Sequence, residues 1–369
     1  MNIDFIEALN EIERDKGIKK DVLIDAIEAA LISSYKRNFN TAQNVRVDIN
    51  RQTGDIKVFA RKTVVDEVLD PRLEISLDAA HEINGNYQLN DIVEIEVTPA
   101  DFGRIAAQTA KQVVTQRIRE AERGLIYEAF IDKEEDIVTG IVQRQDTRNI
   151  YVDLGKVEAV LPLNEIMPNE KFRQGERIKA YITKVENTTK GPQILLSRTH
   201  PGLLKRLFEL EVPEIYEGVV EIKSVAREAG FRSKIAVYSR NDEVDPVGSC
   251  VGPKGMRVQT IVGELRGEKI DIVRWSEDVE EYVSNALSPA QVLEVIVLGD
   301  EKVARVIVPD HQLSLAIGIK GQNARLAAKL TGWKIDIKSE SQAETEFGRP
   351  RSRAASADDL YDTDAYSLD

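Results

Sequence analysis

Two short glycine loops, offset by 66 residues, combine residue types suited to holding a nucleic-acid backbone. They are Gly252-Pro253-Lys254-Gly255 and Gly318-Ile319-Lys320-Gly321. A Gly-x-x-Gly turn between two helices lets a sugar-phosphate chain come close, because glycine has no Cβ to obstruct it. The following helix presents free N–H groups and the positive end of its dipole, and each lysine can neutralise one phosphate. The loops therefore predict a grip on single-stranded RNA.

Polar side chains follow each loop along the predicted helix, on the edge that a bound strand would face. They are Arg257 and Gln259 in the first copy, and Gln322, Asn323 and Arg325 in the second. Aliphatic side chains beside the loops, Val251 and Ile317 among them, are suited to form a floor for bases. Each of the five polar residues fits RNA contact, but each also fits ordinary solvated helix surface.

The loops lie inside a longer internal repeat. Lys269-Ile270-Asp271-Ile272 returns as Lys334-Ile335-Asp336-Ile337, and both copies show the order helix, two alternating strands, helix, glycine loop, helix, strand. The paired strands are predicted near 219–225 and 234–238, and again near 292–298 and 303–308. One glycine loop alone is a weak signal, but two in the same context are a strong one. Two copies are too few for a solenoid, so we predict two tandem KH domains of α+β fold, at 200–278 and 279–345.

Residues 131–199 predict a small barrel. Five short runs with strand character lie at 137–144, 149–155, 158–163, 177–186 and 192–198. Five strands with little helix suit a closed OB-type barrel, which binds single strands by stacking bases on aromatic side chains beside a basic rim. Tyr151 is the stacking candidate, although it fits a core position equally well. Arg198, with Arg144 and Arg148, is a candidate phosphate partner.

The remaining segments frame these modules. Residues 1–130 predict a mixed α/β domain with helices at 3–15, 20–35 and 104–129, a hairpin at 45–49 and 56–59, and a strand at 92–97. After about Ser341 few apolar residues remain. Such a composition cannot offset its ordering entropy, so we predict a disordered acidic tail at 346–369. The expected architecture is therefore a multidomain α+β chain.

Composition limits the class of protein. The 369 residues allow two to four domains, and 42% hydrophobic with 31% charged residues fit a soluble globular chain. The single cysteine, Cys250, fits a reducing compartment, and the absence of a long apolar run or signal peptide completes the expectation of a cytoplasmic protein with no membrane contact. The net charge is −13, but residues 131–199 hold 11 basic and 11 acidic side chains. RNA affinity must therefore come from local patches rather than a bulk positive field.

The sequence shows no catalytic, metal or cofactor site. His81, His200 and His311 lie in separate segments without cysteine or carboxylate at ligand spacing. The first glycine loop is too short for a nucleotide-binding P-loop. Ser249 and Cys250 offer a hydroxyl and a thiol, but no partner base is recognisable. We therefore expect a protein that is not an enzyme.

The motifs resemble a known family of bacterial transcription factors. Asp245–Gln259 (DPVGSCVGPKGMRVQ) and Gly267–Val273 are similar to the first KH motif of the NusA family. Ala316–Ala327 (AIGIKGQNARLA), followed by Gly332-Trp333, resembles its second KH motif. The order of N-terminal domain, S1 barrel and paired KH domains resembles this family over residues 1–345.

The resemblance implies a function. Residues 1–130 would dock on RNA polymerase, while the S1 and KH modules would take the emerging single-stranded RNA and so modulate pausing, intrinsic termination and antitermination. Other transcription factors are possible further partners, and a monomer is expected. Some members of the family carry C-terminal acidic repeats, and here only a short acidic tail follows the KH pair. Two alternatives stay open: an S1/KH protein of RNA processing or decay that does not act on polymerase, and a protein-interaction scaffold whose glycine turns are only structural.

Overall fold

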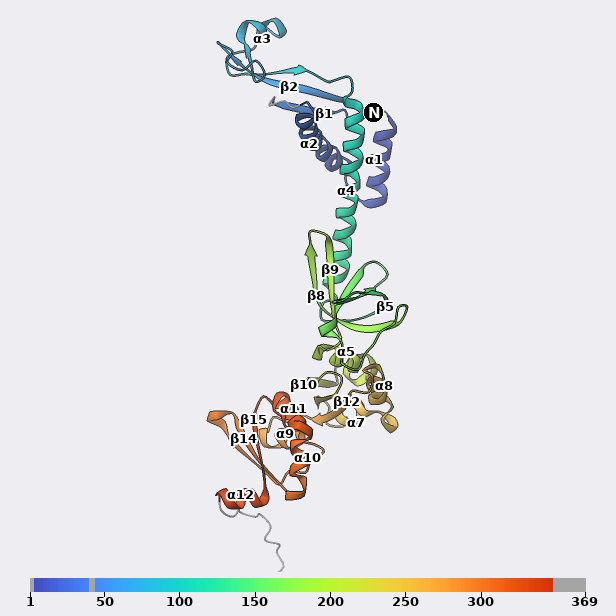
Figure 1. Cartoon of the computed structure of the whole chain (residues 1–369), viewed down its shortest axis with the longest axis vertical. Coiled ribbons are helices and arrows are strands. Elements are labelled where there is room, and N and C mark those ends of the chain that lie inside the picture. Colours follow the sequence, from blue (N-terminus) through green and yellow to red (C-terminus); the bar gives the residue numbers. More distant parts are fainter. Residues whose placement is uncertain (1–2, 40–43, 348–369) are drawn as a thin grey trace, which may run out of the picture. The chain divides into compact units, whose positions relative to one another are not determined.

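A computed structural model describes residues 3–39 and 44–347 (Figure 1). The chain divides into two compact units. The first is formed by the residues up to Ala129 together with Asn187–Pro192, and the second by the rest. No described helix is long and apolar enough to cross a lipid bilayer.

The N-terminal part packs helices on a four-stranded sheet. Its elements are α1 (Ile3–Lys16), α2 (Lys20–Asn38), β1 (Val45–Ile49), β2 (Ile56–Val65), β3 (Glu74–Ser76), α3 (Leu77–Ile83), β4 (Ile92–Glu96) and α4 (Phe102–Ile131). Strand β2 pairs antiparallel with β1 and β4 and parallel with β3. Leu23, Ile27 and Leu31 recur every four residues on α2 and are fully buried, which places one helix face in the core. The predicted helices and hairpin are present, whereas β3 and α3 were not predicted.

The next five strands close into the predicted barrel. They are β5 (Ile137–Gln145), β6 (Asn149–Asp153), β7 (Glu158–Pro162), β8 (Arg177–Thr188) and β9 (Gly191–Ser197), with a 3-10 turn, η1 (Leu163–Glu165), after β7. They follow the order β5-β6-β7-β9-β8. Gly140 lies where β5 approaches β6, and a Cβ there would stand 2.8 Å from the Asp153 carbonyl oxygen. The barrel therefore requires glycine at this position.

The two KH domains repeat one topology. The first contains α5 (Pro201–Glu211), α6 (Pro213–Tyr216), β10 (Val220–Glu228), β11 (Arg232–Ser239), α7 (Pro246–Val251), η2 (Pro253–Gly255), α8 (Met256–Glu264) and β12 (Lys269–Arg274). The second contains α9 (Val279–Ala286), β13 (Glu294–Leu298), η3 (Gly299–Glu301), β14 (Val303–Val308), η4 (Asp310–Gln312), α10 (Leu313–Ile317), η5 (Ile319–Gly321), α11 (Gln322–Thr331) and β15 (Lys334–Ser339). In each sheet the first two strands are antiparallel and the last two parallel. The predicted strands and the predicted order of elements are confirmed.

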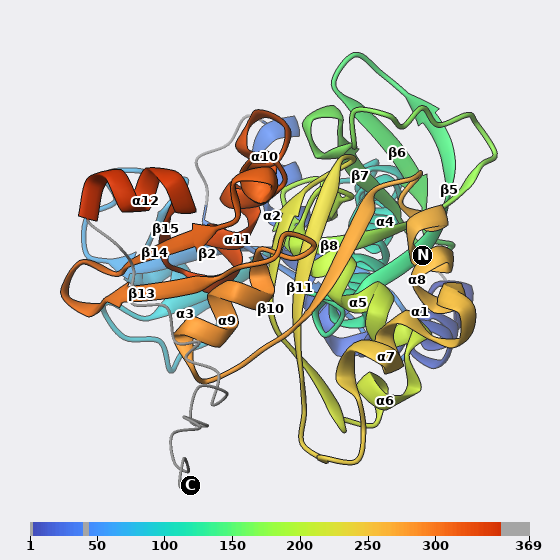
Figure 2. The ribbon, with the colours of Figure 1, turned by 90° about the horizontal axis from the view of Figure 1, so that it is seen from below.

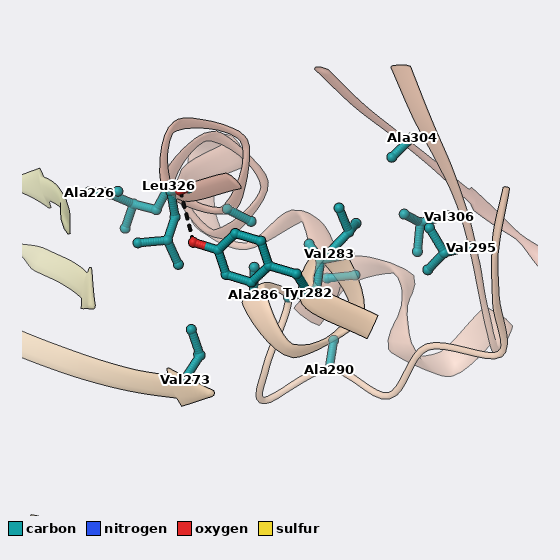
Figure 3. Packing of buried hydrophobic residues seen from close by; sticks show 14 of the residues in the cluster. Ala226, Val273, Tyr282, Val283, Ala286, Ala290, Val295, Ala304, Val306 and Leu326 are labelled. Carbon is teal, nitrogen blue, oxygen red and sulfur yellow. Dashed lines mark hydrogen bonds between the residues drawn. The ribbon is translucent and has the colours of Figure 1, made fainter. Parts of the chain in front are cut away.

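One hydrophobic core runs through both KH domains. Ala226 and Val273 from the first domain belong to the same buried cluster as Tyr282 and Leu326 from the second (Figure 3). The Tyr282 hydroxyl donates to the Leu330 carbonyl oxygen at 3.0 Å, and burial raises the pKa of Tyr282 to about 12. Helix α11 lies against β10 (Figure 2). The two KH domains therefore share a packed interface rather than being joined only by a flexible linker.

The chain beyond the second KH sheet is partly ordered, which corrects the expectation for its first residues. Helix α12 (Glu340–Phe347) follows β15 directly and contacts β14 and β15. Ala343 is buried in this contact. Disorder from about Ser341 was therefore the wrong prediction as far as Phe347, and residues 348–369 lie outside the described part of the chain.

Candidate nucleic-acid interface

Both glycine loops have the same backbone geometry. Gly252 and Gly318 have φ of +72° and +77°, and Gly255 and Gly321 have φ of +76° and +73°. This is the left-handed region, which glycine adopts without a steric penalty. A Cβ on Gly318 would also stand 2.8 Å from the Asn323 backbone nitrogen. Each loop is therefore a fixed turn that depends on its glycines.

The exposed middle of each loop carries its lysine toward solvent. Lys254 and Lys320 have positive φ values of +52° and +53°, which strains a non-glycine residue by about 1 kcal/mol. Ile319 is 85% exposed. Gly255 and Gly321 are the N-cap residues of helices α8 and α11, and neither start is capped by a side chain. The N–H groups of Met256 and Gln322 donate to the carbonyl oxygens of Pro253 and Ile319 within the loops. The positive end of each helix dipole lies beside the loop lysine, and this arrangement suits a phosphate clamp.

Arg257 and Asn323 occupy equivalent positions and brace the loops from inside. Arg257 donates to the Ser249 carbonyl oxygen at 2.6 Å and pairs with Glu214 at 2.9 Å. Asn323 donates to the carbonyl oxygens of Ala316 and Leu287 and is only 4% exposed. The prediction that the Asn323 side chain contacts RNA was wrong, because the side chain is buried and its Nδ2 holds the end of α10. Its Oδ1 has no hydrogen-bond partner among the described residues. The guanidinium of Arg257 likewise holds the end of the helix before its loop, but Arg257 is only half-buried and keeps partial access to solvent.

The other polar residues after the loops divide into two groups. Gln322 and Arg325 both turn toward Glu228 of the first KH domain, at 2.8 Å and 2.6 Å. The hydrogen bond from Arg325 lowers the pKa of the Glu228 carboxyl, so this carboxylate is ionised and partly neutralises the arginine. Gln259 is exposed on α8 without such a partner among the described residues. The structure therefore leaves Gln259 free, while Gln322 and Arg325 join the two domains.

Tyr151 lies on the barrel surface within a polar cluster. Its ring faces the Arg144 guanidinium at 3.5 Å, and its hydroxyl donates to Asp146 at 2.9 Å. Arg144 also pairs with Glu158 at 2.8 Å. Tyr151 is half-buried rather than part of the core. Of the two interpretations, the surface one fits, but a base would have to share or displace the stacked guanidinium.

Arg198 is not on the barrel rim, and the prediction that it contacts phosphate was wrong. Its side chain is 2% exposed and forms a bidentate ion pair with Glu170, which is itself fully buried. It also donates to the Glu264 carbonyl oxygen at 2.9 Å. Because the guanidinium connects the barrel to α8 of the first KH domain, it holds two RNA-binding modules together instead of touching RNA.

A second buried ion pair at the same junction was not predicted. Arg227 and Glu268 are both fully buried, and their two bonds are each 2.9 Å long. Glu268 also accepts hydrogen bonds from Gly230 N and the Ser233 hydroxyl, and Arg227 donates to the His200 carbonyl oxygen. The buried guanidinium and the buried carboxylate therefore both have hydrogen-bond partners in addition to each other. The only sequence signal was the position of Glu268 beside the repeated Lys-Ile-Asp-Ile stretch.

Cys250 is buried on α7 and is expected to be chemically inert in the folded protein. Burial raises the pKa of its thiol to about 12, and the thiolate is the reactive form. At pH 8 a thiol reagent such as Ellman's reagent should release no chromophore from the native chain and one equivalent per chain in denaturant. Rapid labelling of the native chain, with circular dichroism unchanged, would contradict this placement.

No cluster of three or more His, Cys, Asp or Glu side chains suited to a metal ion occurs in residues 3–39 and 44–347. The charged groups of the interface are instead lysines on the loops and ion pairs behind them. The geometry suits a binding surface on which the two glycine loops would each hold a phosphate.

Comparison with known proteins agrees with this architecture over nearly the whole chain. Four family models match: a NusA N-terminal domain at residues 4–124, an S1 RNA binding domain at 131–197, and NusA-like first and second KH domains at 198–275 and 279–345. A protein of Halalkalibacterium halodurans named transcription termination/antitermination protein NusA is 74% identical over 360 residues, covering 98% of this chain and 94% of that protein. The chain belongs to the NusA family.

Further NusA proteins are similar at greater distance. The Bacillus subtilis protein is 71% identical and covers 93% of this chain and 92% of its own length, and the Thermus thermophilus protein is 44% identical with 91% and 89% covered. The solution structure of the N-terminal domain of NusA from Bacillus subtilis is 68% identical over 33% of this chain and 99% of that chain, with a TM-score of 0.31. The family models and the curated relatives confirm the resemblance and the fold class expected from the sequence.

Proposed function

We propose that this NusA protein binds RNA polymerase through residues 1–130 and holds nascent single-stranded RNA on its S1 barrel and KH pair. Like its named relatives, it acts in transcription termination and antitermination, with effects on pausing. The observation that best supports this proposal is the duplicated glycine loop. It places Lys254 and Lys320 in the same strained, exposed geometry before two helix starts that no side chain caps.

The proposed RNA contacts are those that the structure leaves accessible. They are the two glycine loops, the free side chain of Gln259, and the Tyr151 surface of the barrel, with the partly committed residues Arg257, Gln322 and Arg325 at the margin. Each module alone is a small, nearly neutral surface. Several such surfaces on one chain raise the effective concentration of RNA at the next site. A chain that also binds polymerase can therefore favour or hinder hairpin growth in exiting RNA without performing chemistry.

Polymerase binding is tested by co-elution. The full chain and a fragment of residues 1–130 should both co-elute with bacterial core RNA polymerase in gel filtration, while a chain that begins at residue 131 should not. Circular dichroism of each fragment checks that it is folded. Failure of the full chain to co-elute would leave the RNA surface intact but would place its function away from polymerase. The same column measures the expected monomeric state.

The proposal includes no catalysis, cofactor or membrane, and it places the protein in the cytoplasm with polymerase. If the protein were instead an RNA-processing enzyme, it would shorten labelled RNA in the presence of phosphate and magnesium. We expect the RNA to stay intact. A scaffold with purely structural glycine turns would show RNA binding that does not weaken steeply with salt, whereas phosphate contacts release counterions and do weaken.

A further inference from the structure

A groove of about 710 Å³ lies beside the last strand of the second KH domain. Its aliphatic side is formed by Leu313 and Ile317 of α10 and by Ile337 of β15. Ile317 directly precedes the glycine loop at Gly318. The groove therefore extends from the phosphate clamp along the strand edge.

The opposite wall of this groove is α12, which lies alongside β14 and β15 (Figure 2). It contributes the polar side chains Ser341, Gln342 and Thr345. The Gln342 Oε1 accepts a hydrogen bond from the Ser339 backbone N–H at 3.1 Å. Its Nε2 donates to no group in residues 3–39 and 44–347. The amide is thus held in place by its oxygen, while two N–H donors remain available.

A second groove lies beside the last strand of the first KH domain, but its lining includes residues before β13 and none of α7. This groove, of about 540 Å³, lies beside β12. It is lined by Ile272 and Val273, which the offset of 65 residues relates to strand positions in β15. Its wall includes Ser284 and Asn285 from α9, the helix that follows β12. The Asn285 Nδ2 donates to the Arg274 carbonyl oxygen at 3.2 Å. Offset 65 pairs Arg274 with Ser339, so the end of the last strand in each sheet is hydrogen-bonded to an amide of the helix that follows, Asn285 as donor and Gln342 as acceptor.

We propose that α12 is the base-reading wall of the second KH domain, and that Gln342 selects RNA bases that present hydrogen-bond acceptors to its amide N–H groups. This rests on the proposed RNA binding by the glycine loops. Phosphate contacts at Lys320 fix a strand but carry no sequence information. Bases laid on the aliphatic side of the groove point their edges outward, and a side-chain amide is a group that discriminates between such edges.

Substitution of Gln342 in the full chain tests the proposal. Gln342→Glu keeps an oxygen that can accept from Ser339 N–H but removes both N–H donors. The hydrogen bond to Ser339 should therefore remain, while the selection of bases should be lost. Gln342→Ala removes the acceptor oxygen as well as the N–H donors. A random single-stranded RNA pool, selected on the wild type and sequenced, should show one position with a strong base preference that both variants lose. For Gln342→Ala, which changes no charge, affinity for the selected RNA should fall about tenfold, with an unchanged slope of log affinity against log salt. Glu344→Gln on the same helix, outside the groove lining, is the control and should retain the preference.

Two outcomes separate this proposal from the one on which it rests. If Ile319→Asp with Lys320→Asp weakens RNA binding while both Gln342 variants keep the wild-type base preference, the reading wall is refuted and the clamp stands. If the aspartate pair leaves RNA binding and its salt slope unchanged, the second KH loop does not hold RNA, and the inference about Gln342 falls with it. Circular dichroism of every variant excludes misfolding as the cause.

Discussion

A chain with Pro253, Lys254, Ile319 and Lys320 all replaced by aspartate should lose roughly 100-fold or more of its RNA affinity at low salt. The four substitutions remove both loop lysines and place carboxylates where phosphate is expected to lie. All four positions are exposed, so no core packing is lost. Aspartate also tolerates positive φ better than most residues, so the backbone of Lys254 and Lys320 can keep its shape.

Fluorescence anisotropy with a labelled single-stranded RNA measures this effect over a range of salt concentrations. The salt slope should become shallower, because fewer phosphates are neutralised. The control is Lys205→Asp with Leu210→Asp, two exposed positions on α5 that change the charge by the same amount as one loop. It should cost far less than one loop pair. Wild-type affinity in the loop variant, with an intact circular dichroism spectrum, would remove the loops from the RNA surface.

Removal of one partner from the buried pair at the junction of barrel and first KH domain should destabilise that part of the chain strongly. Glu268→Ala leaves the fully buried Arg227 without its carboxylate and removes the acceptor of Gly230 N and Ser233 Oγ. Loss of one member of a buried pair costs about 3–5 kcal/mol. The midpoint of urea unfolding, followed by circular dichroism, should fall accordingly.

The matched control for this prediction is an exposed ion pair on the barrel. Glu158→Ala removes the partner of Arg144, where both side chains are about half exposed, and such pairs contribute about 0–1 kcal/mol. If Glu268→Ala and Glu158→Ala shift the midpoint equally, then Arg227 and Glu268 do not secure the junction.

The features that the sequence predicted well are local ones. Alternation of apolar residues and the glycine turns determine strands and loops over a few residues, so the barrel strands and both KH repeats could be placed from periodicity. The duplicated lysine within the loops was likewise visible, because its meaning depends on its two neighbouring glycines.

The features that could not be predicted depend on contacts between residues that are far apart in the sequence. Arg198 follows a barrel strand like any rim arginine, but Glu170 from the loop before β8 and Glu264 of the KH domain hold it inward. Asn323 is a polar residue on an amphipathic helix, yet its amide nitrogen donates to the carbonyl oxygens of Leu287, just after α9, and of Ala316 in α10. The composition of the segment after Ser341 indicated disorder, but the sheet surface of the second KH domain supplies the apolar contact that the segment lacks by itself.

The core shared by the two KH domains fixes the distance between their glycine loops. With Tyr282, Leu326, Val273 and Ala226 in one packed cluster, the two clamps cannot drift apart or rotate independently without exposing that core. An RNA that engages both loops must therefore present two unpaired stretches at one set separation. The pair then measures the spacing of single-stranded segments, and an RNA hairpin that shortens this separation would be released from one clamp.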